Sequence, residues 1–331
     1  MTAVTAAMPH SQPARRRRSR WWFAAAVVVV LAIGAGVSWW TGLLAGVTGR
    51  PHCVATALGQ TTELDPEQAG NAATIAAVAV HRGLPGRAAT IGIATAMQES
   101  KLRNLDYGDR DSRGLFQQRP SQGWGTVEQI MDPVYASNAF YDVLVKIEGY
   151  QNLPITTAAQ QVQRSAFPSA YGDHEPAARI LASALSGYST ASLSCVLDSP
   201  SGLAAQTPAE NGLTARAARL AKAALAETGR QASASASSGA GSSGASSGGG
   251  SSSSGSGSDV ARGTTVTFTV TGAEGRRLGW ALAHWAVARA QGLDVVAVRT
   301  DGMQWRRDNG EAGWTATPSA PAAGTVTIQV G

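Results

Sequence analysis

The sequence predicts a mainly α-helical domain that follows an N-terminal transmembrane helix and precedes a small α/β domain. Three observations support this organisation. Apolar residues recur at helical spacing between 65 and 185, a nearly continuous apolar stretch lies close to the N-terminus, and strand-like alternation follows a run of Ala, Ser and Gly. A chain of 331 residues has room for two domains.

The N-terminus combines a basic tail with an apolar segment. Residues 1–20 are rich in Ala, Pro and Arg and are predicted to be disordered in the cytoplasm. Residues 21–47 form the predicted transmembrane signal-anchor, because about 18 residues between two Trp pairs span roughly 27 Å of helix, close to the hydrocarbon core of a bilayer. A cleaved signal peptide is the alternative, but the apolar run is long for one.

The charge distribution predicts an orientation in the membrane. The net charge of +5 owes much to the arginines among residues 15–20, which favour a cytoplasmic N-terminus. We therefore expect a single-pass protein of the cell membrane whose main domains lie outside the cytoplasm. The same arginines are no evidence for a nucleic-acid surface, and no motif that reads RNA or DNA appears. The five histidines are scattered, so neither a metal centre nor a cofactor is expected.

The two cysteines bracket the predicted helical domain, which is expected at 53–200. Cys53 lies near its start and Cys195 near its end. In an oxidising compartment such a pair predicts one disulfide that joins the two ends of the domain. Two separate thiols are the alternative.

The helical domain is predicted to begin with a loop at 54–63. A first helix then starts at Asp65, a favourable N-cap, with Pro66 in the first helical position. Gly83 is suited to end it. A second helix opens after Pro85. Further helices are predicted at 126–131, 133–145, 156–163 and 176–185.

The C-terminal third is predicted to contain a helix, a linker and a small domain. An Ala-rich helix is expected at 207–230 and a flexible Ser/Gly/Ala linker at 231–258. Residues 259–331 alternate strand and helix patterns and predict an α/β domain of unknown role. Its tryptophans are interpreted as core residues, with stacking on sugars as the alternative; they are Trp280, Trp285, Trp305 and Trp314.

The second helix carries the candidate catalytic residue. Its apolar spacing leads to Glu99 at its end, and a polar loop that lacks helical periodicity follows. A carboxyl group at the end of a buried helix and beside a groove can donate a proton at neutral pH when burial disfavours its charged form. Glu99 is therefore a candidate general acid, with a solvated helix-end carboxylate as the alternative.

Two short segments carry a resemblance to a known family. Glu99-Ser100, followed by Gly114-Leu115-Phe116-Gln117, resembles the Glu-Ser…Gly-Leu-x-Gln signature of the lytic transglycosylase and goose-type lysozyme superfamily. The resemblance covers roughly Ala69 to Leu185. The loop before Gly114 departs from the family pattern, and Ala170-Tyr171 is the expected counterpart of its Ala-Tyr-Asn motif.

The resemblance implies an enzyme of the bacterial cell wall. Such enzymes cleave the β-1,4 bonds between N-acetylmuramic acid and N-acetylglucosamine in peptidoglycan, and Glu99 would act as general acid and then as base. A lytic transglycosylase leaves a 1,6-anhydro end and needs no second carboxylate. A lysozyme leaves a reducing end and would need one of Asp106, Asp109 or Asp111, for which turn capping is the alternative role.

The resemblance also implies the other residues of the site. Ser100 and Gln117 match the family pattern directly and are predicted to bind substrate. Gln118, Tyr171 and Trp124 are predicted by type, the first two as hydrogen-bond partners and Trp124 as a platform for a sugar ring. The expected partners are peptidoglycan strands, the membrane and an envelope protein at the C-terminal domain. The alternative function is a non-catalytic lysozyme-like protein that binds peptidoglycan or scaffolds an envelope complex.

Overall fold

A β-hairpin opens the folded part of the chain, where the sequence predicts a loop. The computed structural model describes residues 49–164, 168–200, 203–234 and 263–331. Strands β1 (His52–Ala57) and β2 (Gln60–Leu64) pair in antiparallel fashion. The turn between them consists of Leu58 and Gly59, whose φ angles of 56° and 73° suit a two-residue hairpin loop.

A third strand completes this sheet and carries the second cysteine of the predicted disulfide, which is confirmed. Strand β3 (Leu193–Val196) pairs with β1, so the strand order is β2-β1-β3. Cys53 and Cys195 lie directly opposite each other in the ladder and are joined by a disulfide. The bond ties the first strand of the unit to the last strand of its helical part.

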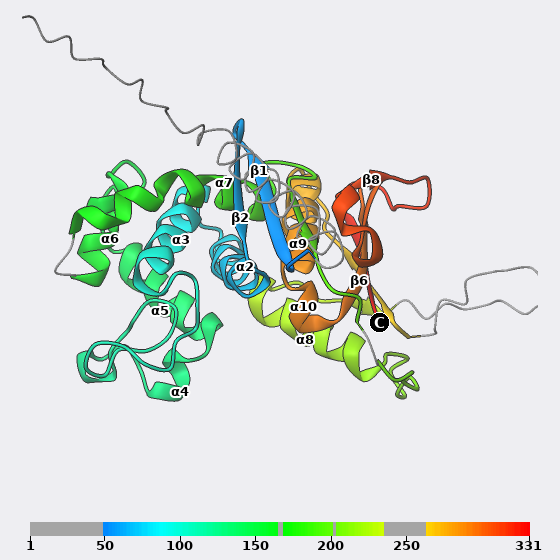
Figure 1. The fold of residues 1–331 in the computed structure, drawn as a ribbon, viewed down its shortest axis with the longest axis horizontal. Helices are drawn as coiled ribbons and strands as arrows, with labels where there is room; N and C mark the ends of the chain where they lie inside the picture. Colours follow the sequence, from blue (N-terminus) through cyan, green and yellow to red (C-terminus); the bar gives the residue numbers. More distant parts are fainter. Residues whose placement is uncertain (1–48, 165–167, 201–202, 235–262) are drawn as a thin grey trace, which may run out of the picture. The chain divides into compact units, whose positions relative to one another are not determined.

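Two helices at the centre of the unit begin where the sequence predicts. Helix α2 (Pro66–His81) starts with a reciprocal capping box between Asp65 and Gln68, and its residues from 69 to 79 are all buried. Helix α3 (Gly86–Ser100) packs against α2 and ends where Lys101 adopts a left-handed conformation. Figure 1 shows α2 between α3 and α5 on one side and the helices that accompany the second sheet, α8 and α9, on the other.

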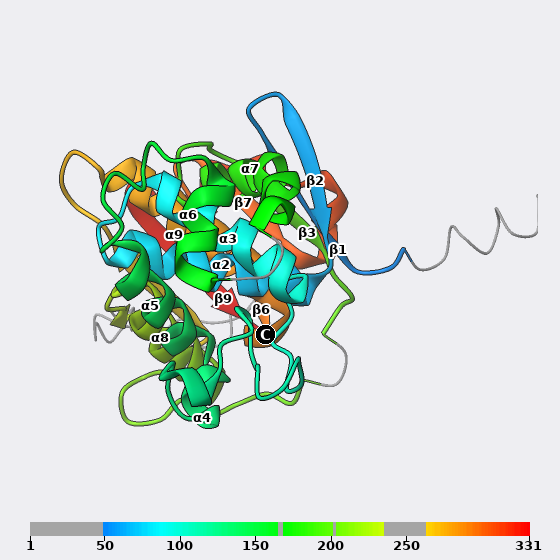
Figure 2. The same cartoon turned by 90° about the vertical axis from the view of Figure 1, so that its left-hand side faces the viewer.

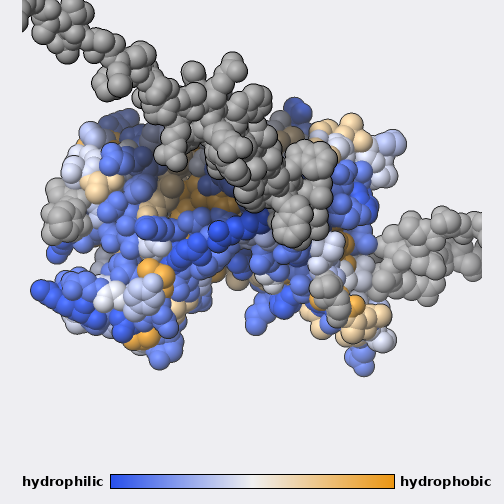
Figure 3. Space-filling view, viewed as in Figure 1, coloured by the Kyte–Doolittle hydropathy of each residue, from blue (hydrophilic) through white to orange (hydrophobic). Residues whose placement is uncertain are grey.

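Shorter helices complete the helical part. They are η1 (Pro120–Gln122), α4 (Val127–Ile130), α5 (Pro133–Leu144), α6 (Ile155–Gln163), η2 (Pro168–His174) and α7 (Glu175–Leu185). Helix α7 packs on both α3 and the β1–β2 hairpin, and Figure 2 shows the three side by side. The hydrophilic side chains face solvent, and the surface in Figure 3 is mostly hydrophilic, with hydrophobic residues in a few patches.

The second sheet is antiparallel throughout, with the order β4-β5-β9-β6-β7-β8. Its strands are β4 (Ser233–Ala234), β5 (Thr265–Thr269), β6 (Val295–Thr300), β7 (Met303–Arg306), β8 (Thr315–Ala316) and β9 (Thr325–Val330). The accompanying helices are α8 (Ala215–Thr228), α9 (Gly275–Ala288), α10 (Ala290–Leu293) and η3 (Arg307–Ala312).

The second sheet and the helical part pack together as one unit, which runs from Pro51 to the C-terminus. Helix α9 contacts β6 and β9 as well as α2 and α7. The carboxylate of Glu227 is buried in this junction. It accepts hydrogen bonds from the Thr74 hydroxyl at 2.7 Å and the Trp285 indole at 2.8 Å, and it pairs with Arg289 at 3.0 Å.

The tryptophans of the C-terminal part belong to this packing. Trp280, Trp285 and Trp305 are almost fully buried. The indole N–H groups of Trp305 and Trp314 donate to the carbonyl oxygens of Cys195 and Leu193, both in strand β3. These contacts favour the core interpretation of the four residues.

The predicted linker at 231–258 begins with residues that include strand β4, which pairs with β5. Ser233 pairs with Thr267 and Ala234 with Val266, so β4 and β5 flank the segment 235–262. That segment lies outside the described residues. The sheet therefore takes its first strand from before the Ser/Gly-rich segment and all the others from after it.

The predicted fold class is wrong in its balance of helix and strand. About 46% of the described residues are helical and 17% are in strands, arranged in two antiparallel sheets. The region predicted as mainly helical contains a sheet of its own. The sequence does not predict its strand β2 because the polar stretch Gln60–Glu63 is largely exposed and gives no apolar alternation. In the second sheet β6 and β7 form a hairpin, whereas the β5–β9 and β6–β9 pairings join strands that are distant in sequence.

The predicted membrane protein also requires correction. None of the helices in the described ranges is long and apolar enough to cross a bilayer, which contradicts the expected single-pass anchor and the localisation built on it. The tail at 1–20 and the apolar segment at 21–47, from which that expectation came, lie outside the described residues.

Candidate active site

The Glu99 carboxyl group lies in the last turn of α3 and is half-buried. Its Oε1 accepts a hydrogen bond of 2.6 Å from the hydroxyl of Tyr171, which lies in η2 and is fully buried. An O–H···O distance of this size is that of a well-formed hydrogen bond. The structure thus brings together two of the residues that the sequence predicts for the site.

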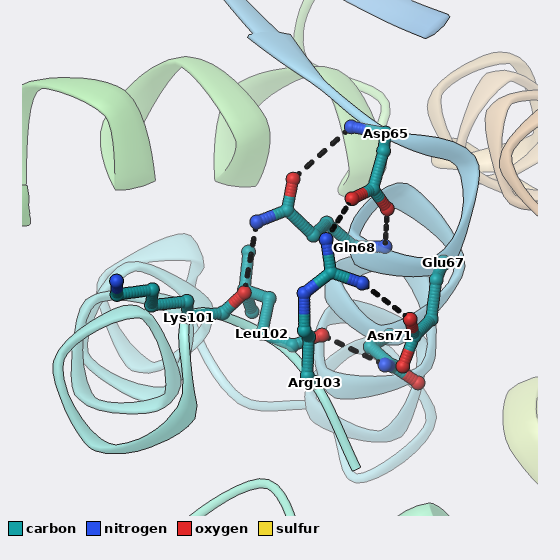
Figure 4. A network of polar contacts seen from close by, with 7 residues as sticks. All are labelled: Asp65, Glu67, Gln68, Asn71, Lys101, Leu102 and Arg103. Atoms are coloured by element: carbon teal, nitrogen blue, oxygen red, sulfur yellow. Dashed lines mark hydrogen bonds and ion pairs between the residues drawn. The ribbon is translucent and has the colours of Figure 1, made fainter. Parts of the chain in front are cut away.

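A polar network fixes the end of the helix that carries Glu99 (Figure 4). The Gln68 side chain donates to the carbonyl oxygen of Lys101 at 2.9 Å, and Asn71 donates to that of Leu102 at 2.8 Å. Arg103 pairs with two carboxylates at the start of α2, those of Asp65 and Glu67. The start of α2 therefore holds the chain directly after Glu99.

Ser100 joins the two halves of the sequence signature. Its hydroxyl contacts the carbonyl oxygen of Ala96 within α3 and that of Leu115 at 2.8 Å. The side chain is buried, so it is placed to hold Leu115 beside the helix end. The predicted contact between Ser100 and substrate has no support in this geometry.

Gln117 of the signature and its neighbour Gln118 have internal partners. Gln117 adopts a positive φ of 47°, and its amide donates to the carbonyl oxygens of Tyr107 at 3.3 Å and Gly114 at 3.2 Å. Gln118 is buried and donates to the Ala136 carbonyl at 3.1 Å. Gln117 remains half-buried, whereas Gln118 ties the loop to α5.

The three aspartates of the loop differ in their surroundings. Asp111 accepts hydrogen bonds from the backbone N–H of Ser121 at 2.8 Å and the Arg119 guanidinium at 2.7 Å, and these donors hold its pKa well below the usual range. Asp106 and Asp109 are exposed. No contact described for any of the three joins it to Glu99, and Asp111 has the turn-stabilising role that was the alternative.

Trp124 lines a pocket of about 400 Å³. The pocket lies between the segment after η1 and the helices α5 and α6, and Val143, Val162, Gln163 and Arg164 also line it. Gln163 donates to the carbonyl oxygen of Phe116 at 2.7 Å. The wall of the pocket is therefore attached to the second half of the sequence signature.

No protein-family model matches this chain, and no curated protein is similar to it at a significant level. The assignment of a function therefore depends on the residues and their geometry. In the part of the chain that the structure describes, no group of three His, Cys, Asp or Glu side chains is placed to hold a metal ion.

Sequence reasoning missed one pair beside the site. His174 Nε2 lies 3.0 Å from the side-chain oxygen of Gln98, the residue before Glu99, and this contact is a second connection between η2 and α3. Burial lowers the pKa of His174, although the charge of Asp173 opposes the shift. The position of Gln98 next to Glu99 was a usable signal, but its partner depends on the packing of η2.

Proposed function

We propose that the protein cleaves the glycan strands of peptidoglycan, with Glu99 as the general acid. The observation that carries this proposal is the hydrogen bond from Tyr171 to Glu99, two residues 72 positions apart in the chain. The two residues come from separate motifs of the resemblance, in which they belong to one site. The contact between Ser100 and Leu115 adds support, because it sets the Gly-Leu segment beside the same helix end.

The hydrogen bond from Tyr171 determines which oxygen of the Glu99 carboxyl group can transfer a proton. The phenol donates to Oε1, so the proton that the acid transfers is carried by Oε2. Transfer of that proton to the glycosidic oxygen releases the leaving sugar as an alcohol while positive charge develops on the ring. The Tyr171 hydroxyl then stabilises the carboxylate that Glu99 has become.

The second half of the proposed reaction uses the substrate's own groups. The N-acetyl group stabilises the positive charge at C1, and the 6-hydroxyl then attacks C1 and forms the 1,6-anhydro bond. Glu99 takes up the proton of that hydroxyl and regains its starting state. Asp111 is engaged by Arg119 and Ser121, which favours this route over hydrolysis with a second carboxylate.

Analysis of the reaction products tests the proposal. The full chain is incubated with purified peptidoglycan, and the soluble fragments are identified by mass spectrometry. We expect muropeptides with 1,6-anhydro ends, which are lighter by one water than those with reducing ends. Reducing ends would assign the protein to the lysozymes. Absence of soluble fragments, together with co-sedimentation of the protein with peptidoglycan, would reject cleavage in favour of the binding function.

A further inference from the structure

The pocket beside the candidate site contains one uncompensated charge. Of its lining residues, only Arg164 is charged, and none is acidic. Arg164 ends helix α6 in a left-handed conformation with φ of 51°, and its backbone N–H bonds to Gln160. Its exposed guanidinium has no ion pair or hydrogen bond within the described residues. A cavity with one positive group and no acidic partner favours an anionic ligand.

The pocket also offers an aromatic surface. The Trp124 indole is half-buried against the core and lines the pocket. Its N–H has no protein acceptor in the described part of the chain and remains available to a ligand. Val143 and Val162 add apolar surface. The pocket is therefore mostly polar, and Trp124 with the two valines gives it an apolar face on which a sugar ring can lie.

The pocket wall and the helix end that carries Glu99 both bond to the segment 115–116. Gln163, in the pocket wall, donates to the carbonyl oxygen of Phe116 at 2.7 Å. The preceding carbonyl, that of Leu115, accepts the hydrogen bond from Ser100, the neighbour of Glu99. The pocket wall is therefore connected, through the carbonyls of residues 115 and 116, to the helix end that carries Glu99.

We propose that this pocket binds a sugar that carries a carboxylate, with the ring on Trp124 and the carboxylate on Arg164. A guanidinium presents two parallel N–H donors that match a carboxylate, which makes arginine suited to this recognition. The inference rests on the proposed function, in which the sugar is N-acetylmuramic acid and the carboxylate belongs to its lactyl group. Arg164 is then a residue that determines substrate specificity.

The proposal places glycan cleavage after removal of the peptide from the glycan strand. In intact peptidoglycan the lactyl carboxyl group is joined to a peptide through an amide bond and carries no charge. Hydrolysis of that amide releases the peptide and leaves the carboxylate on the glycan. The preferred substrate is therefore a peptide-free glycan strand, and an amide-hydrolysing enzyme must supply it.

Equilibrium binding tests the proposal without relying on cleavage. Peptide-free glycan oligosaccharides are compared with the same oligosaccharides after conversion of their lactyl carboxylates to methylamides. Isothermal titration calorimetry is carried out on the full chain with Glu99→Gln, so that the ligand is not consumed. We expect the methylamide form to bind about tenfold more weakly, the loss typical of one hydrogen bond to a charged group.

Arg164→Gln, introduced into the same background, isolates the contact. It should weaken binding of the carboxylate form by about the same factor and leave binding of the methylamide form unchanged. Arg179→Gln, which replaces an exposed arginine of α7, is the matched control and should change neither affinity. Equal affinities for the two forms, or an equal loss for both in Arg164→Gln, would overturn the assignment.

Two further comparisons test the identity of the acidic sugar and separate the pocket proposal from the proposed activity. Tighter binding of oligogalacturonate than of the muramic acid oligosaccharide would overturn the lactyl assignment and identify the ligand as a uronic acid. Carboxylate-dependent binding without any cleavage by the unmutated chain would support the pocket and reject the proposed activity. Cleavage of both forms at equal rates would support the activity and reject the pocket.

Discussion

The hydroxyl of Tyr171 lies 2.6 Å from Oε1 of Glu99, and this contact joins the 3-10 helix η2 to the last turn of α3. Both ends of the contact are supported by other bonds. His174 and Gln98 form a parallel connection at 3.0 Å, and the capping network of α2 holds the chain after Glu99. The orientation of the Glu99 carboxyl group is therefore set before any substrate binds, as preorganised catalysis requires.

Replacement of Tyr171 by Phe tests this orientation. The variant keeps the buried ring and removes only the hydroxyl, so the cleavage rate should fall by about 10- to 100-fold, the value of a hydrogen bond to a charged group. The melting temperature should change little. Tyr188→Phe removes an exposed hydroxyl and is the matched control. An undiminished rate in Tyr171→Phe would show that the contact has no role in catalysis.

The disulfide between Cys53 and Cys195 should contribute strongly to stability. It closes a loop with a sequence separation of 142, for which the chain-entropy model gives an upper value of about 5 kcal/mol. The variant with Ser at both positions should therefore show a large loss in the free energy of unfolding, measured with urea. Reductant should destabilise the natural protein and leave the double variant unaffected. A loss below about 1 kcal/mol would contradict this account.

The segment 235–262 should be dispensable for folding. Its flanking strands β4 and β5 pair with each other, so replacement by a four-residue turn keeps the sheet. The shorter connection costs less entropy to close, and the free energy of unfolding should rise by about 1–2 kcal/mol. Urea denaturation followed by fluorescence measures the change. Loss of the cooperative transition would show that the segment is needed for the fold.

Protonation of His284 should destabilise the protein in mild acid. The ring is fully buried, Nδ1 lies 2.8 Å from the Ala184 carbonyl oxygen, and Nε2 accepts the backbone N–H of Ser192 at 3.1 Å. Nδ1 therefore carries the proton of the neutral ring. Burial lowers the pKa of His284 from 6.5 to about 4, against the opposing effect of the Ala184 carbonyl.

The sign of the pH effect follows from this shift. Between pH 6.5 and 4 the unfolded chain binds more protons at this position than the folded one, so stability falls as the pH falls through that window. The loss is on the order of 3 kcal/mol. Urea denaturation at pH 7.5 and pH 4.5 measures it, and His284→Gln should reduce the difference. An equal difference in both proteins would assign the acid sensitivity to other groups.

The sequence predicts local features well because they depend on neighbouring residues. The start of α2 follows from Asp65 and Pro66. The disulfide joins distant positions, but two cysteines that bracket a predicted domain offer one pairing to consider. The helix predicted at 207–230 begins only at Ala215, because Thr214 caps it through Ala217 N. Features that depend on distant partners are harder to predict, such as the β4–β5 pairing.

The candidate site shows the same division. Sequence motifs select Glu99 and Tyr171 as candidate site residues, and the structure brings them together. The internal roles of Ser100 and Gln118 depend on the Leu115 and Ala136 carbonyls, whose positions the sequence does not reveal. Both residues connect backbone segments instead of facing a substrate.

The comparison of Glu99→Gln with the unmutated chain tests the central claim most directly. Glutamine keeps the size of the side chain and can still accept the Tyr171 hydroxyl, but it has no proton to transfer. General acid catalysis contributes about 10²–10⁴-fold, and Glu99 acts twice in the proposed reaction, so the rate of release of soluble fragments from peptidoglycan should fall by at least the upper value. Glu128→Gln, at an exposed position of α4, should retain full activity. Full activity in Glu99→Gln, with an unchanged melting temperature, would contradict the account.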